Sequence, residues 1–239
     1  MQVSTIRRPT LYGLWSFQFL TMMRRGVFYS FMYIYLFSLL GNVTTTATLG
    51  TFTMLLSAAG QNLLWGKISD RYRLRAQLIV IGEVIAGFTY IIVFFVHKYF
   101  IEGGNDFTAG LALVTGLSVL EFFWSMSDVG WAALVTDITT PETRGGFVGA
   151  INFVMSTGRM TGIIIAGYLY LDGSGFRQGT IFFVVSAMLL AGAVVIWLVS
   201  RALKPREISD LLGTARKEER NLTDKSQTSP TYGIGPDQV

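Results

Sequence analysis

Charged side chains interrupt several long apolar runs of this sequence, and their spacing indicates a polar site in an apolar setting. Glu121 and Asp128 are seven residues apart, so on a helix they share one face about two turns apart. Trp124 falls on the same stripe and would supply an aromatic surface. Arg24 and Arg25 lie in another apolar run and would supply the opposite charge. Because adjacent helical residues point about 100° apart, we expect at most one of these arginines to face a shared cavity.

Two interpretations of this charge set stay open. A charge at mid-bilayer costs roughly 2.5–3.5 kcal/mol on insertion scales, so a partner or water must offset it. One interpretation is ion pairing that joins helices, and we expect it for Glu83 and Arg159, which have no charged companion on their own helical faces. The other is a cavity that binds a polar solute or an ion, lined by Arg24, Arg25, Glu121, Trp124 and Asp128.

The composition argues against several other kinds of chemistry. The 239 residues include no cysteine and one histidine, His97, which excludes thiolate and multi-histidine metal sites. No phosphate-binding loop of the form G-x-x-x-x-G-K-[ST] is present, and no nucleophile or acid–base cluster stands out. We therefore expect no catalytic site, no metal, no cofactor and no enzyme activity. His97 falls at the end of an apolar run, where we expect it to be solvated or interfacial.

The apolar runs themselves have the length of membrane-spanning helices. Only 14% of the residues are charged, whereas a soluble domain averages roughly 25%. A crossing takes about 20 mostly apolar residues, and Gly41-Asn42 breaks the longest uncharged stretch. The sequence thus predicts an all-α, polytopic membrane protein with six transmembrane helices at about 10–40, 46–68, 76–96, 108–136, 145–171 and 178–200.

Basic residues gather on one side of these predicted helices. Ten lie in connections on that side and two, Lys98 and Arg177, on the other. Because cytoplasmic connections carry the excess of Lys and Arg, we expect a cell-membrane protein with both termini in the cytoplasm, bound to lipid and not to nucleic acid. The ten are Arg7, Arg8, Lys67, Arg71, Arg73, Arg75, Arg144, Arg201, Lys204 and Arg206.

The chain divides at about residue 200. We expect residues 1–200 to form the six-helix domain, and residues 201–239 to form a cytoplasmic amphipathic segment with a disordered tail. A faint internal repeat favours two inverted triplets of helices, a 3+3 arrangement common in transporters. In each middle helix of a triplet, glycines precede an aspartate: Gly50, Gly60, Gly66 and Asp70, then Gly149, Gly158, Gly167 and Asp172.

The connection after the second predicted helix resembles the signature of the major facilitator superfamily, G-x-L-x-D-R-x-G-R-R. Gly66, Asp70, Arg71 and Arg75 match that pattern. The connection between the fourth and fifth helices, with Asp137, Pro141, Glu142, Arg144 and Gly145, is similar to the family's second cytoplasmic connection.

This resemblance implies the amino-terminal, six-helix half of a secondary transporter, which would move a small solute by alternating access. It implies a cytoplasmic gate formed by Gly66, Asp70, Arg71, Arg75, Asp137 and Arg144. Either a coupling ion, proton or sodium, or the solute's own gradient would drive transport, and a second half would come from another copy of the chain or from a partner chain. The alternative is a non-transporting membrane assembly or interaction protein, or a truncated remnant. The sequence does not indicate the solute or the direction of transport.

Overall fold

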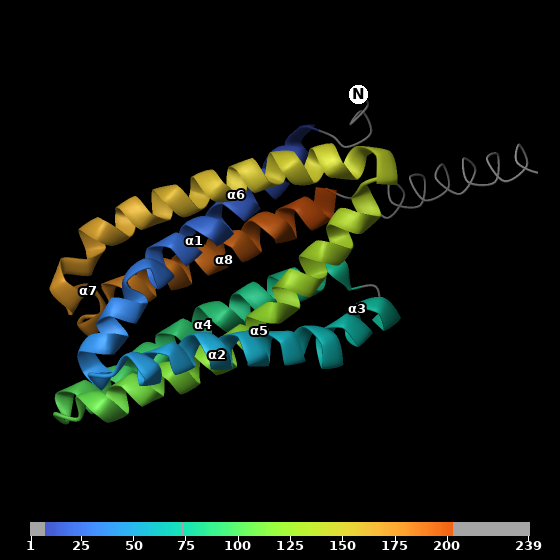
Figure 1. The fold of residues 1–239 in the computed structure, drawn as a ribbon. Coiled ribbons are helices and arrows are strands. Elements are labelled where there is room, and N and C mark those ends of the chain that lie inside the picture. The colour runs from blue at the N-terminus through green and yellow to red at the C-terminus, as the bar shows by residue number, and fades with distance from the viewer. Residues whose placement is uncertain (1–7, 73, 203–239) are drawn as a thin grey trace, which may run out of the picture. The chain divides into compact units, whose positions relative to one another are not determined.

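The computed structural model describes residues 8–72 and 74–202, and within these ranges the chain is built of helices alone (Figure 1). The predicted all-α class is confirmed for this part of the protein. Of the amphipathic segment and tail predicted at 201–239, residues 203–239 lie outside the described residues, as does Arg73. In chain order the elements are α1 (Arg8–Leu40), α2 (Val43–Ala59), η1 (Gly60–Trp65), α3 (Gly66–Tyr72), α4 (Arg75–Glu102), α5 (Asp106–Ile138), α6 (Pro141–Tyr170), η2 (Leu171–Gly173), α7 (Ser174–Arg177) and α8 (Thr180–Ala202).

Turn and capping residues define where the helices stop and start. Gly41 has a φ of 65°, in the left-handed region that glycine adopts without steric cost. Asn42 is the N-cap of α2, and its side-chain oxygen accepts a hydrogen bond from the backbone nitrogen of Thr44 at 2.8 Å. Thr140 begins α6 with a capping box, and Pro141 occupies the first turn. These local interactions separate α1 from α2, and α5 from α6.

Two of the predicted helices differ most from the structure, one in its length and the other in its division into segments. The third, expected at 76–96, continues to Glu102 as part of α4, and an ion pair of 3.6 Å between Lys98 and Glu102 joins adjacent turns there. The second, expected as one helix at 46–68, consists of α2, the π-helical segment η1 and α3. A π turn has i→i+5 hydrogen bonds and so holds one more residue than an α turn, which rotates the side chains that follow it around the helix axis.

The helices pack in two groups (Figure 1). In one group α1 packs against α6 and α8, and in the other α5 packs against α2 and α4. The contact between α4 and α8 joins the groups, and α1 also touches α5. Close approach depends on glycine: a Cβ atom at Gly162 of α6 would overlap the Met23 carbonyl oxygen of α1, and one at Gly158 would crowd the Phe19 carbonyl.

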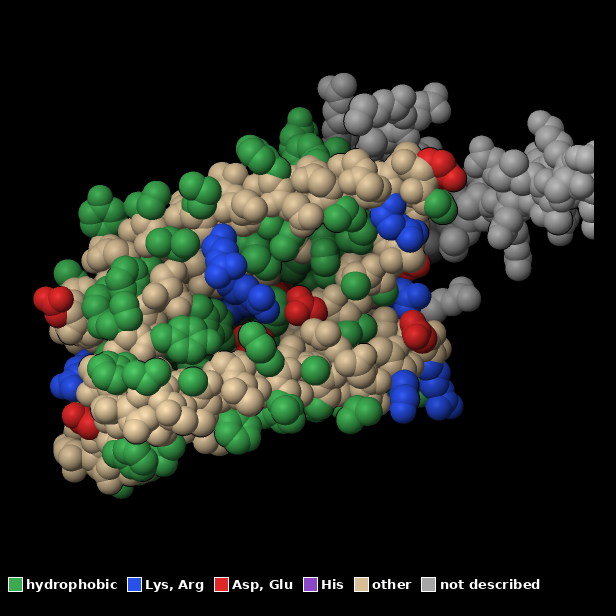
Figure 2. Space-filling model, viewed as in Figure 1, with side chains coloured by type: hydrophobic (Ala, Val, Ile, Leu, Met, Phe, Trp, Pro, Cys, Tyr) green, Lys and Arg blue, Asp and Glu red, His purple; other side chains and the backbone are tan. Residues whose placement is uncertain are grey.

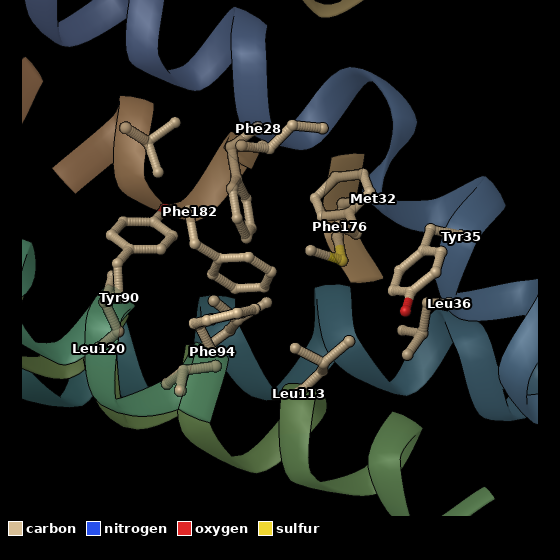
Figure 3. Close-up of a cluster of buried hydrophobic side chains, with 14 of the residues drawn as sticks. Phe28, Met32, Tyr35, Leu36, Tyr90, Phe94, Leu113, Leu120, Phe176 and Phe182 are labelled. Carbon is tan, nitrogen blue, oxygen red and sulfur yellow. The ribbon is translucent and has the colours of Figure 1, made fainter. Parts of the chain in front are cut away.

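An aromatic cluster fills the half of the bundle that contains the later turns of α1. Figure 3 shows Phe28, Tyr90 and Phe182 pointing toward one another from α1, α4 and α8. The ring of Phe28 meets the rings of Tyr90 and Phe182 edge-on, with centroids 4.7 Å and 5.4 Å away. All three side chains are fully buried. This cluster ties both groups of helices together beside the polar region described below.

His97 belongs to this packed half, and the expectation that it is solvated or interfacial was wrong. The residue is fully buried. Its Nε2 atom lies 2.8 Å from the Tyr35 hydroxyl, and its Nδ1 atom lies 3.3 Å from the Ala109 carbonyl oxygen. Because a carbonyl can only accept, Nδ1 carries the proton and Nε2 accepts from Tyr35. His97 therefore links α4 to α1 and to α5.

Four helices in the described part of the chain are long and apolar enough to cross a membrane. They are α4, α5, α6 with its short continuation to Arg177, and α8. α1 has 33 residues but carries two arginines at its centre, and α2 has only 17 residues before the π-helical segment begins. The protein is thus a multi-pass membrane protein, and the count of six crossings remains a prediction.

Candidate solute cavity

Charged residues of three helices lie near the middle of their elements. Arg24 is the central residue of α1 (Arg8–Leu40), and Arg25 follows it. Glu121 lies within one residue of the centre of α5 (Asp106–Ile138), and Arg159 lies within one turn of the centre of α6 (Pro141–Tyr170). In helices of this length the centre is the position farthest from water at either end, where a charge is most costly.

A cavity of about 480 Å³ lies where these helices meet α2 and η1. Figure 2 shows a hollow on this face, where basic and acidic side chains meet among hydrophobic ones. The volume is within the range of small-molecule sites, roughly 300–1,000 Å³. Most of the lining residues carry a polar or charged group, and the lining consists of Arg25, Tyr29, Ser30, Tyr33, Thr53, Met54, Ser57, Ala58, Gln61, Glu121 and Arg159.

Glu121 is held by two groups of α1. The Tyr29 hydroxyl donates a hydrogen bond of 2.6 Å to Oε1 of Glu121. Nη2 of Arg25 lies 3.9 Å from Oε2. The Arg25 guanidinium also lies over the ring of Trp124, 4.3 Å from its centroid, in a cation–π contact. Arg25 and Glu121 thus form a long ion pair in the cavity lining, and the Trp124 ring packs against the Arg25 guanidinium.

Arg24 points away from the cavity lining. It is fully buried, and Nη1 donates a hydrogen bond of 3.0 Å to the Tyr90 hydroxyl of α4. Its guanidinium also lies over Trp124, at 4.8 Å, while Nε and Nη2 have no hydrogen-bond partner among the described residues. One arginine of the pair therefore lines the cavity and the other faces the packed interior, as the angle between adjacent helical residues requires.

Glu83 holds Trp124 in place. Its Oε1 atom accepts hydrogen bonds from Trp124 Nε1 at 3.0 Å and from Ser127 Oγ at 2.7 Å, and the residue is fully buried between α4 and α5. This arrangement agrees with a structural role, although the partners are neutral side chains rather than a basic one. Trp124 itself lies behind Arg25 and does not line the cavity.

Arg159 differs from the expectation of a buried structural pair. The residue is exposed, lines the cavity, and has no carboxylate within 4.0 Å in the part of the chain that the structure describes. Asp128, which was expected to line the cavity, is half-buried farther along α5 and is absent from the lining. Of the five predicted cavity residues, Arg25 and Glu121 line it.

Two polar stripes run through the lining, and sequence reasoning found only Arg25 of them. On α1, Arg25, Tyr29 and Tyr33 recur every four residues, and on α2 and η1 the residues Thr53, Ser57 and Gln61 do the same. Residues four apart share a helical face, so each stripe is visible in the sequence as a polar line through an apolar run.

The π-helical segment η1 brings the second stripe against α5. A Cβ atom at Gly60 would overlap Ser125 Oγ, so glycine allows the close approach. The indole Nε1 of Trp65 donates a hydrogen bond of 2.9 Å to the carbonyl oxygen of Phe122. π-Helical turns are frequent at functional sites, and this one begins beside Gln61 of the cavity lining.

The two sequence motifs assigned to a gate meet at one end of the bundle. Arg75 donates from Nε to Asp137 Oδ2 at 3.0 Å, and from Nη1 to the Ser69 carbonyl oxygen at 2.6 Å. Asp70 lies 4.0 Å from Arg75, but its side chain is 84% exposed. Arg144 donates from Nε to Thr139 at 3.2 Å. Arg75 therefore joins α3, α4 and α5.

The remaining gate residues lie outside this contact. Gly66 is helical, at the junction of η1 and α3, rather than in a turn. Arg71 is exposed in the last turn of α3, and its guanidinium lies 5.6 Å from the centroid of the Tyr72 ring. Ser69, which the motif did not single out, supplies an acceptor for Arg75.

A family model described as Major Facilitator Superfamily matches residues 14–228. The chain belongs to the Major Facilitator Superfamily. Neither the curated proteins nor the solved structures include a match to it. The matched residues include both motifs predicted for the gate and every residue of the cavity lining, so the cavity of this Major Facilitator Superfamily chain lies within the part that the family model covers.

Proposed function

We propose that this chain moves a small polar solute across the cell membrane by alternating access, as a six-helix half that works with a second half. The observation that carries the proposal is the cavity in which Arg25, Glu121 and Arg159 meet near the centres of three apolar helices. Charges there are costly unless water or a solute reaches them. Membership of a transporter family supports the same conclusion.

The packing of the helices supports the 3+3 repeat that alternating access would use. The first three long helices, α1, α2 and α4, can be matched in order with the last three, α5, α6 and α8. Under this match the contact of α1 with α6 corresponds to the contact of α5 with α2. In the same way the contact of α1 with α8 corresponds to the contact of α5 with α4, and the contact of α4 with α8 corresponds to itself. Inverted repeats related by a pseudo-two-fold axis in the membrane plane have this property.

The arrangement of the helix ends supports a cytoplasmic location for both termini. Gly13 near the start of α1 packs against Val199 near the end of α8, so these ends lie on one side (Figure 1). Arg201 and the Arg75–Asp137 contact belong to the same predicted side, which carries the excess of basic residues.

A second half would close the cavity, and it would be another copy of this chain or a partner chain. A coupling ion, proton or sodium, would act at the half-buried Asp128. The alternative, a non-transporting assembly protein, predicts a cavity that never opens to both sides.

Cysteine labelling tests this proposal, because the natural chain contains no cysteine. In sealed vesicles, Ser57→Cys places one thiol in the cavity lining, and a membrane-impermeant maleimide is added to either side. We expect labelling from both sides. Ser186→Cys is the control, because Ser186 is buried and bonded to the Gly87 carbonyl oxygen at 2.8 Å, and it should stay unlabelled. Labelling of S57C from one side only, or from neither, would favour the non-transporting alternative.

A further inference from the structure

We propose that the solute is a small organic anion whose carboxylate binds Arg159 with help from Arg25. This inference rests on the proposed function of the cavity and adds the chemical class of its ligand. The cavity lining contains two guanidinium groups and one carboxylate, Glu121. In a site of low dielectric such an excess of one charge favours a ligand of the opposite charge.

The negative charge of Glu121 is already in use. Tyr29 donates to one of its oxygens at 2.6 Å, Arg25 lies 3.9 Å from the other, and only 6% of the residue is exposed. A cationic solute would have to displace both groups to reach this carboxylate. An anionic solute needs no such rearrangement, since Arg25 lines the cavity and 37% of its side chain is exposed.

Arg159 is the guanidinium of the lining that lacks an acidic partner among the described residues. In residues 8–72 and 74–202 no carboxylate lies within 4.0 Å of it. The acids Glu83 and Asp128 do not reach the cavity lining. Glu83 is enclosed with Trp124 on the α4 side, and Asp128 lies two turns along α5 from Glu121. A bound carboxylate would supply the missing partner, in a bidentate geometry that suits guanidinium.

The neutral groups of the lining fit the same class of ligand. Ser30 and Thr53 donate their hydroxyl hydrogens to carbonyls of their own helices, at 2.6 Å and 2.8 Å. The Gln61 amide has only a long contact of 3.4 Å, to Ser57, and stays available as a donor. Tyr33 and Met54 give the cavity an apolar side. The site therefore suits an anionic head with an apolar body, within about 480 Å³.

Protection of the S57C thiol from maleimide measures the ligand class directly. The probes are benzoate, benzamide and benzylamine at equal concentration, which share a ring and differ in charge. We expect benzoate to protect about tenfold better than benzamide, because a hydrogen bond to a charged group contributes at least about one decade of affinity. Benzylamine, a cation at neutral pH, should protect least.

Arg159→Gln in the S57C background identifies the residue responsible. Benzoate protection should fall to the level of benzamide, while labelling without a probe continues. Arg159→Lys keeps the charge and should retain a preference for benzoate, which guards against a folding defect in the Gln variant. Arg201→Gln is the matched control. Arg201 lies at the end of α8 and outside the cavity lining, with its guanidinium carbon 3.8 Å from the centroid of the Trp197 ring. Its loss should leave the protection by benzoate unchanged.

The failures of the two proposals are distinguishable. Equal protection by benzoate and benzamide, stronger protection by benzylamine, or no protection of a thiol that is labelled from both sides would overturn the anion assignment and leave the transport proposal standing. Full benzoate protection in the Arg159→Gln variant would also overturn it. Labelling of S57C from one side only, or from neither side, would count against transport itself, and the anion assignment would fall with it.

Discussion

Arg75 donates a hydrogen bond of 3.0 Å from Nε to Oδ2 of Asp137, which joins the first turn of α4 to the last turn of α5. The two residues belong to separate sequence motifs that were assigned to one gate on resemblance alone. The gate itself stays a prediction, and it would require a contact of this kind, because a bond between two helix ends can hold one arrangement of the helices and release another.

The Arg75–Asp137 contact should contribute to stability, whereas Asp70 should not. Asp137→Asn is expected to lower the free energy of unfolding by about 1 kcal/mol, because the ion pair is partly exposed. Asp70→Asn is the control and should have almost no effect, since its side chain is 84% exposed and 4.0 Å from Arg75. Denaturant unfolding in detergent measures both. Equal losses in the two variants would contradict the structural arrangement.

Arg75→Gln completes the test of this contact through a double-mutant cycle with Asp137→Asn. The Arg75 variant should lose about 1 kcal/mol more than the Asp137 variant, because Arg75 also donates to the carbonyl oxygen and the hydroxyl of Ser69 in α3. The cycle isolates the coupling of Arg75 to Asp137 from those other hydrogen bonds. A coupling energy of zero would show that the contact does not hold the helix ends together.

Glu83 is expected to be structural rather than part of solute binding. Glu83→Ala removes the acceptor of both Trp124 and Ser127 in a fully buried site, and should lower the free energy of unfolding by about 3 kcal/mol. Glu83→Gln keeps an oxygen acceptor and should cost clearly less. Thermal unfolding followed by tryptophan fluorescence compares the two variants. A mild effect of Glu83→Ala together with lost benzoate protection would place Glu83 in the binding site instead.

Gly162 should tolerate no side chain, while Gly149 should accept one. Gly162→Ala places a methyl group against the Met23 carbonyl of α1 and should destabilise the protein by about 1–3 kcal/mol. Gly149→Ala is the matched control on the same helix, with no described atom within 4 Å, and should be neutral or slightly stabilising because alanine favours helix. Unfolding measurements decide between them. A destabilising Gly149→Ala would indicate that a neighbouring chain covers that face.

Tyr35→Phe should weaken the packed half of the bundle. It leaves Nε2 of the buried His97 without its donor, at an expected cost of about 1–2 kcal/mol. Tyr99→Phe serves as the control, because Tyr99 is 73% exposed. The midpoints of thermal unfolding of the two variants should therefore differ, and identical midpoints would argue that His97 does not depend on Tyr35.

The assembly should contain more than one six-helix unit. Native mass spectrometry of the protein, extracted in mild detergent, should give twice the 26.5 kDa of one chain or a complex with another membrane chain. A single chain of 26.5 kDa would leave the cavity with one wall and would favour the non-transporting alternative.

Some of these features depend on local interactions, and they could be predicted from the order of the residues. Gly41 and Asn42 end one helix and begin the next through their own backbone conformation and capping, so the break was predictable. The angle between adjacent helical residues meant that Arg24 and Arg25 could not both face one cavity. Arg25 and Glu121 were among the five residues predicted for the cavity, but the spacing did not distinguish Arg25 from Arg24 or Glu121 from Trp124 and Asp128.

Other features depend on neighbours that are distant along the chain, and they could be assigned only after the helices were placed in space. His97 is buried because Tyr35 and the Ala109 carbonyl come to it from α1 and α5. Trp124 turns behind Arg25 because Glu83 of α4 accepts its indole hydrogen. Arg159 lacks a carboxylate partner among the described residues because α6 places it beside the cavity and away from Glu83 and Asp128. A side chain's burial and partners are set by the elements packed around it, and the spacing within one helix does not specify them.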